Sequence, residues 1–215
     1  MSRMDKRRLL AWAAAGAACV AAPALAQTRR VMARMTEGPF YPPASWRERW
    51  SDQDADLTRV AGIAQPARGE HLGLEAVLAD AQGRPIDGAT IEIWQCDAAG
   101  VYRHPSVHVD AGEFDAGFQG FGSTRSDRDG RLRLRTIRPV PYPGRTPHIH
   151  IRMNHASFGT FTTQLFVAGE AANARDGLYR RLSADARTAL EMVLQPAPAD
   201  SGLRWLVRQE LLLPA

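Results

Sequence analysis

From residue 71 onward the sequence repeats one pattern, in which short stretches of alternating apolar and polar residues are divided by turn residues. The apolar positions of the first stretch are Leu72, Leu74, Ala76 and Leu78, and residues 80–83 after it form an Asp-Ala-Gln-Gly turn. Alternation with a period of two predicts a β-strand with one buried face, because successive side chains of a strand point to opposite sides of the sheet. Residues 89–95 resume this strand pattern.

Further strands are predicted in the second half of the chain. Residues 124–126 and 132–136 flank an Asp-Arg-Asp-Gly turn at 127–130, which favours a β-hairpin. Residues 161–167 form another candidate strand, and a closing strand is indicated by alternation at Leu203, Trp205 and Val207. Many short strands with such turns predict an all-β fold, a single-domain sandwich or barrel, and we favour the β-sandwich.

One late helix is expected among these strands. Ser183 is suited to an N-cap and Asp185 to the first turn, and we expect the helix to run to about Leu194. Pro196 and Pro198 then prevent its continuation.

The chain of 215 residues has the length of one domain, preceded by two other segments. Residues 1–26 have the form of a signal peptide: basic residues up to Arg8, an apolar run over about 9–22, and a small-x-small cleavage site ending at Ala26. Residues 27–70 are predicted to form an extended N-terminal arm, since 36–43 are too rich in proline for a helix. The sandwich then covers residues 71–215.

The leader predicts an exported, periplasmic protein. Arg7-Arg8 followed by two leucines resembles the twin-arginine signal, although paired basic residues also occur in ordinary secretory leaders, so both routes stay open. Outside the leader no stretch approaches the twenty apolar residues of a membrane span, so none is expected. Cys96 is then the only cysteine of the mature chain and is expected to be a buried thiol.

The high calculated pI of about 9.6 comes largely from the leader. Four of the 27 basic residues and one of the 23 acidic residues lie in residues 1–26, which leaves 23 against 22 and a net charge of +1. A nearly neutral domain without a basic run gives no basis for nucleic-acid binding. The sequence does not fix the oligomeric state, and a homo-oligomer is compatible with it.

Residues 141–150 bring a phenol, a guanidinium and two imidazoles within nine positions, at Tyr142, Arg145, His148 and His150. If 148–151 form a strand, both histidines face one side of the sheet and the two isoleucines face the other. Tyr142 lies between two prolines, which stiffen the loop that enters this strand. The pattern is typical of a metal site, although paired strand histidines can also be purely structural.

A second tyrosine, Tyr102, follows the strand predicted at 89–95. Because a phenol has a pKa near 10, only a strongly Lewis-acidic cation can displace its proton, and ferric iron is such a cation. Two phenolates, two neutral imidazoles and one hydroxide would neutralise Fe³⁺. A catecholate dianion that replaced the hydroxide and one phenolate would leave the site neutral again, which avoids burial of a net charge.

The combination of Tyr102 with Tyr142, His148 and His150 resembles the intradiol ring-cleavage dioxygenases. The resemblance covers about residues 35–170 and is carried by residues 37–41, 88–95, 100–102, 142–150 and 162–166. It is closer to subunits of protocatechuate 3,4-dioxygenase and to exported members than to the catechol 1,2-dioxygenases, because the chain carries no helical N-terminal stretch of the kind that dimerises the latter.

The resemblance implies a β-sandwich catalytic domain with non-haem Fe(III) that uses O₂ to split a catechol between its two hydroxylated carbons, giving a cis,cis-muconate type product. It implies that Tyr102, Tyr142, His148 and His150 are the iron ligands, with Tyr142 displaced by the substrate. Arg145 would stabilise negative charge on the ring, and Gln164 would shape the pocket.

Two alternatives of other classes stay open. His104 and His108 could join His148 and His150 in a zinc or copper site, or each could be solvated or line the pocket. The chain could also be an exported β-sandwich binding module that has lost the chemistry, although nothing in the sequence supports such a loss. Colour separates the three, because tyrosinate bound to Fe(III) is wine-red whereas a zinc site or an empty module is colourless.

Overall fold

The computed structural model describes residues 29–50, 52–107 and 114–214. The helices of these ranges are α1 (Ala44–Arg47) and α2 (Ala184–Leu190), with the 3-10 helices η1 (Ala171–Arg175) and η2 (Tyr179–Arg181). The strands are β1 (His71–Ala79), β2 (Thr90–Trp94), β3 (Phe121–Arg125), β4 (Arg131–Ile137), β5 (His148–His155), β6 (Gly159–Val167), β7 (Glu191–Met192), β8 (Gln195–Pro196) and β9 (Trp205–Leu212). Within these ranges no helix is both long and apolar enough to cross a membrane.

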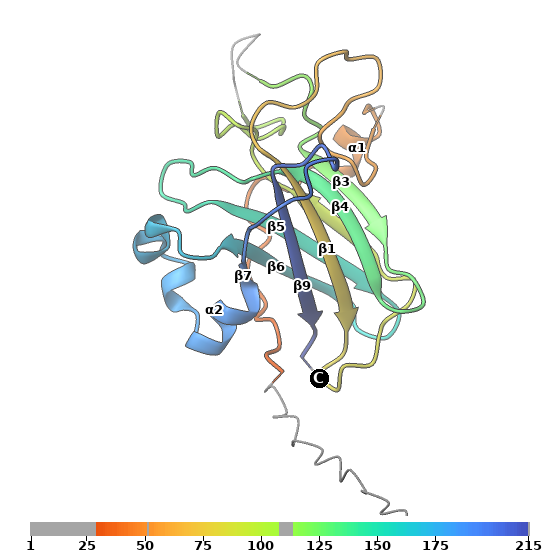
Figure 1. The fold of residues 1–215 in the computed structure, drawn as a ribbon, viewed down its shortest axis with the longest axis vertical. Coiled ribbons are helices and arrows are strands. Elements are labelled where there is room, and N and C mark those ends of the chain that lie inside the picture. The colour runs from red at the N-terminus through yellow and green to blue at the C-terminus, as the bar shows by residue number, and fades with distance from the viewer. Residues whose placement is uncertain (1–28, 51, 108–113, 215) are drawn as a thin grey trace, which may run out of the picture.

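The strands of the described ranges form two sheets that pack face to face (Figure 1). The four-stranded sheet has the order β4-β1-β9-β8, and the five-stranded sheet has the order β3-β2-β5-β6-β7. Most neighbours are antiparallel, whereas β1 runs parallel to β9 and β6 parallel to β7. This arrangement confirms the predicted all-β sandwich with one late helix, α2.

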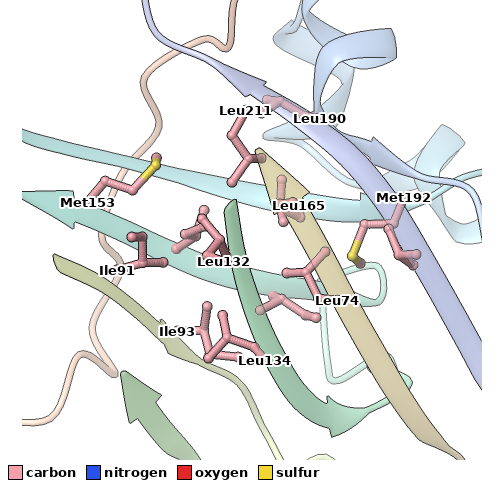
Figure 2. Close-up of a cluster of buried hydrophobic side chains, with 14 of the residues drawn as sticks. Leu74, Ile91, Ile93, Leu132, Leu134, Met153, Leu165, Leu190, Met192 and Leu211 are labelled. Atoms are coloured by element: carbon pink, nitrogen blue, oxygen red, sulfur yellow. The ribbon is translucent and has the colours of Figure 1, made fainter. Parts of the chain in front are cut away.

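The hydrophobic core lies between the two sheets (Figure 2). The four-stranded sheet contributes Leu74, Leu132, Leu134 and Leu211, and the five-stranded sheet contributes Ile91, Ile93, Met153 and Leu165. The predicted apolar positions of β1, Leu72, Leu74, Ala76 and Leu78, are all buried. Period-two alternation therefore identified the inward face of β1 correctly.

The predicted hairpin at 127–130 is wrong in one respect. The turn forms, since Gly130 N donates to Asp127 O at 2.8 Å. However, β3 pairs with β2 in the five-stranded sheet, and β4 pairs with β1 in the four-stranded sheet. A turn motif specifies a reversal of chain direction but not whether its two arms pair, and here the chain crosses from one sheet to the other.

The late helix is shorter than predicted. Ser183 is the N-cap, as expected, and its hydroxyl accepts from Ala186 N at 3.2 Å. The helix ends at Leu190 rather than near Leu194, because the next two residues form β7 and pair with the edge of β6. Pairing with an open sheet edge thus replaces further helical turns.

Residues 29–43 run along the sandwich without helix or strand, with a turn at residues 39–40, before the single turn of α1. Met32 N donates to Leu212 O of β9 at 2.8 Å, and Met35 N donates to Thr162 O of β6 at 2.9 Å. Beyond these contacts the segment passes over the outer face of the five-stranded sheet, where Tyr41 Oη donates to Glu92 Oε2 at 2.9 Å. We call residues 29–43 the arm segment.

Candidate active site

Strand β5 divides its side chains between the two faces of the five-stranded sheet. Ile149 and Ile151 are fully buried in the core between the sheets. His148 and His150 alternate with them and therefore face the opposite side, where they are 1% and 2% exposed. The structure thus confirms that the two histidines share one face.

The register of the five-stranded sheet places His150 in one row across the strands with three other residues. His150 lies opposite Trp94 of β2 and Gln164 of β6, and Trp94 lies opposite Phe121 of β3. The imidazole of His150 stacks on the Trp94 indole, with ring centroids 4.8 Å apart and an angle of 13° between the planes. This stacking restricts rotation of the imidazole.

Tyr142 and Arg145 are brought together by a tight turn. Arg145 N donates to Tyr142 O at 2.9 Å, and Gly144 has a φ of 81°. Pro143 and Gly144 suit the two central positions, since proline fixes φ at the first and glycine tolerates positive φ at the second. As a result, Arg145 Nη1 lies 3.4 Å from Tyr142 Oη.

Tyr102 follows a second loop, which the side chain of Asp97 stabilises by hydrogen bonds to backbone amides. Asp97 Oδ1 accepts from Val101 N at 3.0 Å, and Gly100 adopts a φ of 82°. A Cβ on Gly100 would lie 3.4 Å from the carbonyl oxygen of Pro141, so the two tyrosine loops pack directly against each other. Tyr102 is buried in an aromatic cluster that also contains Trp94.

The four predicted ligands converge. The Tyr102 and Tyr142 rings are 5.5 Å apart between centroids, and the Tyr142 and His148 rings are also 5.5 Å apart. Tyr102 lies 6.1 Å from His150 by the same measure. The Nε2 atoms of His148 and His150 are 3.2 Å apart. Residues separated by up to 48 positions in sequence thus surround one small space.

Burial sets the protonation of these groups. It lowers the pKa of His148 to about 4 and that of His150 well below its usual value, with positive Arg145 acting in the same direction. Both imidazoles are therefore neutral at pH 7. Burial raises the pKa of Tyr102 well above 10 and also raises that of Tyr142, against the opposing effect of Arg145. A strongly Lewis-acidic cation is needed to turn either phenol into a phenolate.

The donor atoms fit such a cation. Within the described residues, the buried Oη of Tyr102 has no hydrogen-bond partner. The Nδ1 of His148 lies 2.6 Å from Thr146 O, which can only accept, so Nδ1 carries the proton and Nε2 presents a lone pair. A buried phenol without a partner and a free imidazole lone pair in one small space are oxygen and nitrogen donors that could hold a metal ion.

Arg145 lies beside this space and is held from two sides. Its Nε donates to Asp176 Oδ2 at 2.8 Å, and its Nη2 donates to Gln164 Oε1. Gln164 is fully buried, and its Nε2 donates to Thr36 O of the arm segment at 3.1 Å. The structure therefore brings both predicted non-ligand residues, Arg145 and Gln164, into contact at the site.

The arm segment closes the site from outside. A Cβ on Gly38, whose φ is 75°, would lie 3.2 Å from Cε1 of His150. The ring of Phe40 stacks on Tyr102 with centroids 4.6 Å apart and lies 6.3 Å from Tyr142. Glycine at position 38 thus permits both the close approach and the backbone conformation that carry Phe40 over Tyr102.

The other candidates lie elsewhere. His104 contacts Phe40, with centroids 5.9 Å apart, and its Nδ1 lies 2.8 Å from Ser106 Oγ. In the part of the chain that the structure describes, no three side chains of His, Cys, Asp or Glu could hold a metal, so a histidine site that includes His104 has no support. His108 and the predicted leader lie outside the described residues. Cys96 is buried, as expected, and its thiol lies 3.7 Å from Val140 O.

Sequence reasoning missed Asp176, Trp94 and Gly38 as parts of the site. Asp176 lies between η1 and η2 with no motif around it, so no local signal identified it. Trp94 could have been placed beside His150 only once the strand register was known. Gly38 belongs to the stretch 37–41, which resembles the family without indicating what the glycine contacts.

The comparisons with known proteins agree with this geometry. The family model described as "Dioxygenase" matches residues 36–199. The beta chain of protocatechuate 3,4-dioxygenase from Burkholderia cepacia is 32% identical over 174 residues, which cover 71% of this chain and 74% of that protein. Hydroxyquinol 1,2-dioxygenase from Corynebacterium glutamicum is 29% identical over 136 residues, which cover 54% of this chain and only 43% of the relative.

Solved structures resemble the whole sandwich. The dioxygenase domain of a carbohydrate-binding fusion protein from Streptomyces sp. SirexAA-E has a TM-score of 0.63 at 26% identity, covering 86% of this chain and 99% of that one. An intradiol ring-cleavage dioxygenase from Tetranychus urticae has a TM-score of 0.64 at 20% identity, with 86% and 95% covered, and shares the fold. The fold, the matched family model and the relatives together show an oxidoreductase of the dioxygenase class. The chain belongs to the intradiol ring-cleavage dioxygenase family.

Proposed function

We propose that this protein is a non-haem Fe(III) dioxygenase that cleaves a catechol-type ring between its two hydroxylated carbons with O₂, giving a cis,cis-muconate type product. The relatives are named for protocatechuate and hydroxyquinol, which supports a 1,2-dihydroxybenzene as the substrate class. The observation that carries the proposal is the convergence of two phenols and two imidazoles, with the Nε2 atoms of His148 and His150 3.2 Å apart.

Tyr102, Tyr142, His148 and His150 would hold the iron. When bound, ferric iron would supply the Lewis acidity that binds both catechol oxygens and activates the ring toward O₂. The neutral imidazoles add no charge, so the two phenols decide the charge of the site. Tyr102 is 5% exposed and enclosed by Phe40 and Trp94, which favours a permanent ligand.

Tyr142 is suited to a different role, because it is only half-buried and lies on a surface turn. It would leave as substrate arrives and accept one of the two catechol protons on its phenolate oxygen. Arg145 Nη1 lies 3.4 Å from that oxygen. A guanidinium stays cationic at all relevant pH values, so Arg145 would stabilise negative charge that develops on the ring. Gln164 would hold the guanidinium in place through its Oε1.

The test is metal analysis followed by oxygen uptake. Protein expressed in iron-replete medium should be wine-red, contain about one iron per chain, and consume O₂ with catechol, protocatechuate or hydroxyquinol to give an intradiol product. His148→Ala should lose both the colour and the activity, whereas His155→Ala, at the far and only partly buried end of the same strand, should lose neither. Stoichiometric zinc without iron-dependent activity would contradict the proposal, as would a ring opened outside the two hydroxylated carbons.

We also propose that the protein is exported to the periplasm through the leader of residues 1–26, which the basic start, the apolar run and Ala24-Leu25-Ala26 support. The N-terminal residue of the protein recovered from the periplasmic fraction should be Gln27. Replacement of Arg7 and Arg8 by Lys should block export if the route is twin-arginine, and should leave it unchanged if the route is the general secretory one. Recovery of the intact chain in the cytoplasm only would contradict export.

A further inference from the structure

The carboxylate of Asp176 is fully buried and receives four hydrogen bonds. Its Oδ1 accepts from Leu178 N and Tyr179 N, both at 2.9 Å. Its Oδ2 accepts from Arg145 Nε at 2.8 Å and from Thr146 N at 3.0 Å. One oxygen is therefore fixed to its own loop, and the other reaches the loop that enters β5.

Thr146 makes a second hydrogen bond to the segment that contains Asp176, through Asn173 of η1. Its hydroxyl donates to Asn173 Oδ1 at 2.7 Å, and Asn173 Nδ2 donates to Val167 O at 2.9 Å. The carbonyl oxygen of the fixed Thr146 accepts from His148 Nδ1 at 2.6 Å. A chain of hydrogen bonds thus runs from Asp176 through Thr146 to the imidazole of His148. The Nε2 of this imidazole faces the small space between the four predicted ligands, which we call the metal space.

The contact with Arg145 fixes a direction as well as a position. A guanidinium is planar and rigid, so holding Nε on one edge determines where Nη1 and Nη2 point. With Nε on Asp176, Nη2 reaches Gln164 and Nη1 turns toward Tyr142 Oη. The Asp176 carboxylate also balances the charge of the guanidinium, which keeps the surroundings of the metal space close to neutral.

We propose that Asp176 is a positioning residue that orients the Arg145 guanidinium toward Tyr142 and, through Thr146, holds His148 with its Nε2 free for the metal. The effect on catalysis rests on the proposed function, whereas the effect on metal binding does not. Asp176 is not a catalytic residue, because Arg145 and Thr146 lie between it and the metal space.

A double-mutant cycle tests whether Asp176 acts on turnover by orienting Arg145. Asp176→Asn keeps the shape but removes the negative charge and turns an amide N–H₂ toward one of the two pairs of N–H donors that hold the carboxylate. We expect kcat per bound metal ion to fall by about tenfold to a hundredfold, with a smaller change in KM. In an Arg145→Ala background the same change should cost at most about twofold, because the partner through which it acts is gone. Losses that multiply in the double variant would overturn the Arg145 half.

The rate of metal loss tests whether Asp176 positions His148 through Thr146, and this measurement does not depend on enzyme activity. The metal that the wild-type protein retains should dissociate into excess chelator about tenfold faster from Asp176→Asn, and at the wild-type rate from Arg145→Ala. Unchanged dissociation from Asp176→Asn would overturn the His148 half. A wild-type protein that retains its metal but cleaves no catechol would contradict the proposed function, and this measurement would still decide the role of Asp176.

Asp185→Asn is the matched control, since it makes the same chemical change at a side chain that is 82% exposed and pairs only with Arg30 in the described ranges. It should leave kcat and metal retention at wild-type values. If Asp176→Asn does not fold, Asp176→Glu takes its place in both measurements with the same expectations, because it keeps the charge but displaces the carboxylate by one methylene.

Discussion

The two faces of the five-stranded sheet carry opposite chemistry on the same strands. On β5 the inward residues are isoleucines and a methionine, all without solvent exposure, whereas the outward residues are His148, His150 and Arg152. The inward face packs against the four-stranded sheet, and its apolar side chains are buried there without needing specific polar partners. In the ranges that the structure describes, no sheet packs against the outward face, which is covered by the arm segment and the two tyrosine loops.

The difference shows how one strand can separate stability from chemistry. Apolar burial is roughly proportional to area and needs no particular partner. Buried polar groups, by contrast, cost free energy unless they find partners, and outward residues such as Arg152 and Gln164 find them in the distant arm segment. Changes on the inward face should therefore affect folding, and changes on the outward face should affect metal binding or turnover.

The largest effect is expected on the inward face. Ile151→Ala removes a fully buried side chain, and the free energy of unfolding should fall by about 2–5 kcal/mol, with Ile151→Val at about 0.5–1.5 kcal/mol. Urea denaturation of both variants measures the two values. The folded fraction of each should keep wild-type kcat, and a kcat that falls in proportion to stability would break the separation between the faces.

On the outward side, Arg145→Ala should lower kcat by about a hundredfold or more, because it removes the positive group aimed at developing charge. Its iron content should stay close to that of the wild type, because Arg145 is not among the four converging donors. Steady-state kinetics and metal analysis on the same preparation check both statements. Near-normal turnover would make the role of Arg145 structural.

The two tyrosines beside the outward face should respond differently to the same substitution by phenylalanine. Tyr102→Phe should lose iron roughly tenfold faster than wild type and lack the charge-transfer band even with an inert catechol analogue bound, since the buried phenol oxygen proposed as a ligand is gone. Tyr142→Phe should change the resting spectrum but form a native-like analogue complex, slowly because its base is absent. Visible spectra during titration distinguish them, and identical behaviour of the two variants would refute the assigned roles.

The smallest effect is expected at the contact between the arm segment and the outward face. Gly38→Ala places a Cβ 3.2 Å from Cε1 of His150 at a φ of 75°, so it should cost more than the about 1–2 kcal/mol expected of a positive φ alone. Gly62→Ala, at a φ of 80° with nothing within 4 Å of the added Cβ, is the control for backbone strain alone. Thermal unfolding measures the stability of both variants. An equal loss of stability would mean that the contact with His150 does not contribute to it.

Much of the fold and of the site could be predicted from local pattern. Alternation identified the buried face of β1, and the His-x-His spacing on β5 placed both imidazoles on one side, because strand geometry alone decides such facts. The convergence of the two tyrosines with these histidines was predicted from a resemblance, and the structure brings all four together. Their roles as ligands stay a prediction.

What could not be predicted depends on contacts between distant segments. The turn at 127–130 does not reveal that its two arms belong to different sheets, and the end of α2 at Leu190 depends on the open edge of β6. Asp176 is 31 residues from Arg145 in the chain, and only the packing of η1 and η2 beside the loop before β5 brings the two together. Such contacts leave no periodic signal.

The hydrogen bond from Met32 to Leu212 has a consequence for the order in which the molecule assembles. The arm segment leaves the ribosome early, but its partner strand β9 is synthesised last and must first pair with β1, about 130 positions earlier in the chain. Closing such long loops is slow. We therefore expect the site to be completed late in folding, with the amides of Met32 and Met35 among the last to gain protection in pulsed hydrogen exchange.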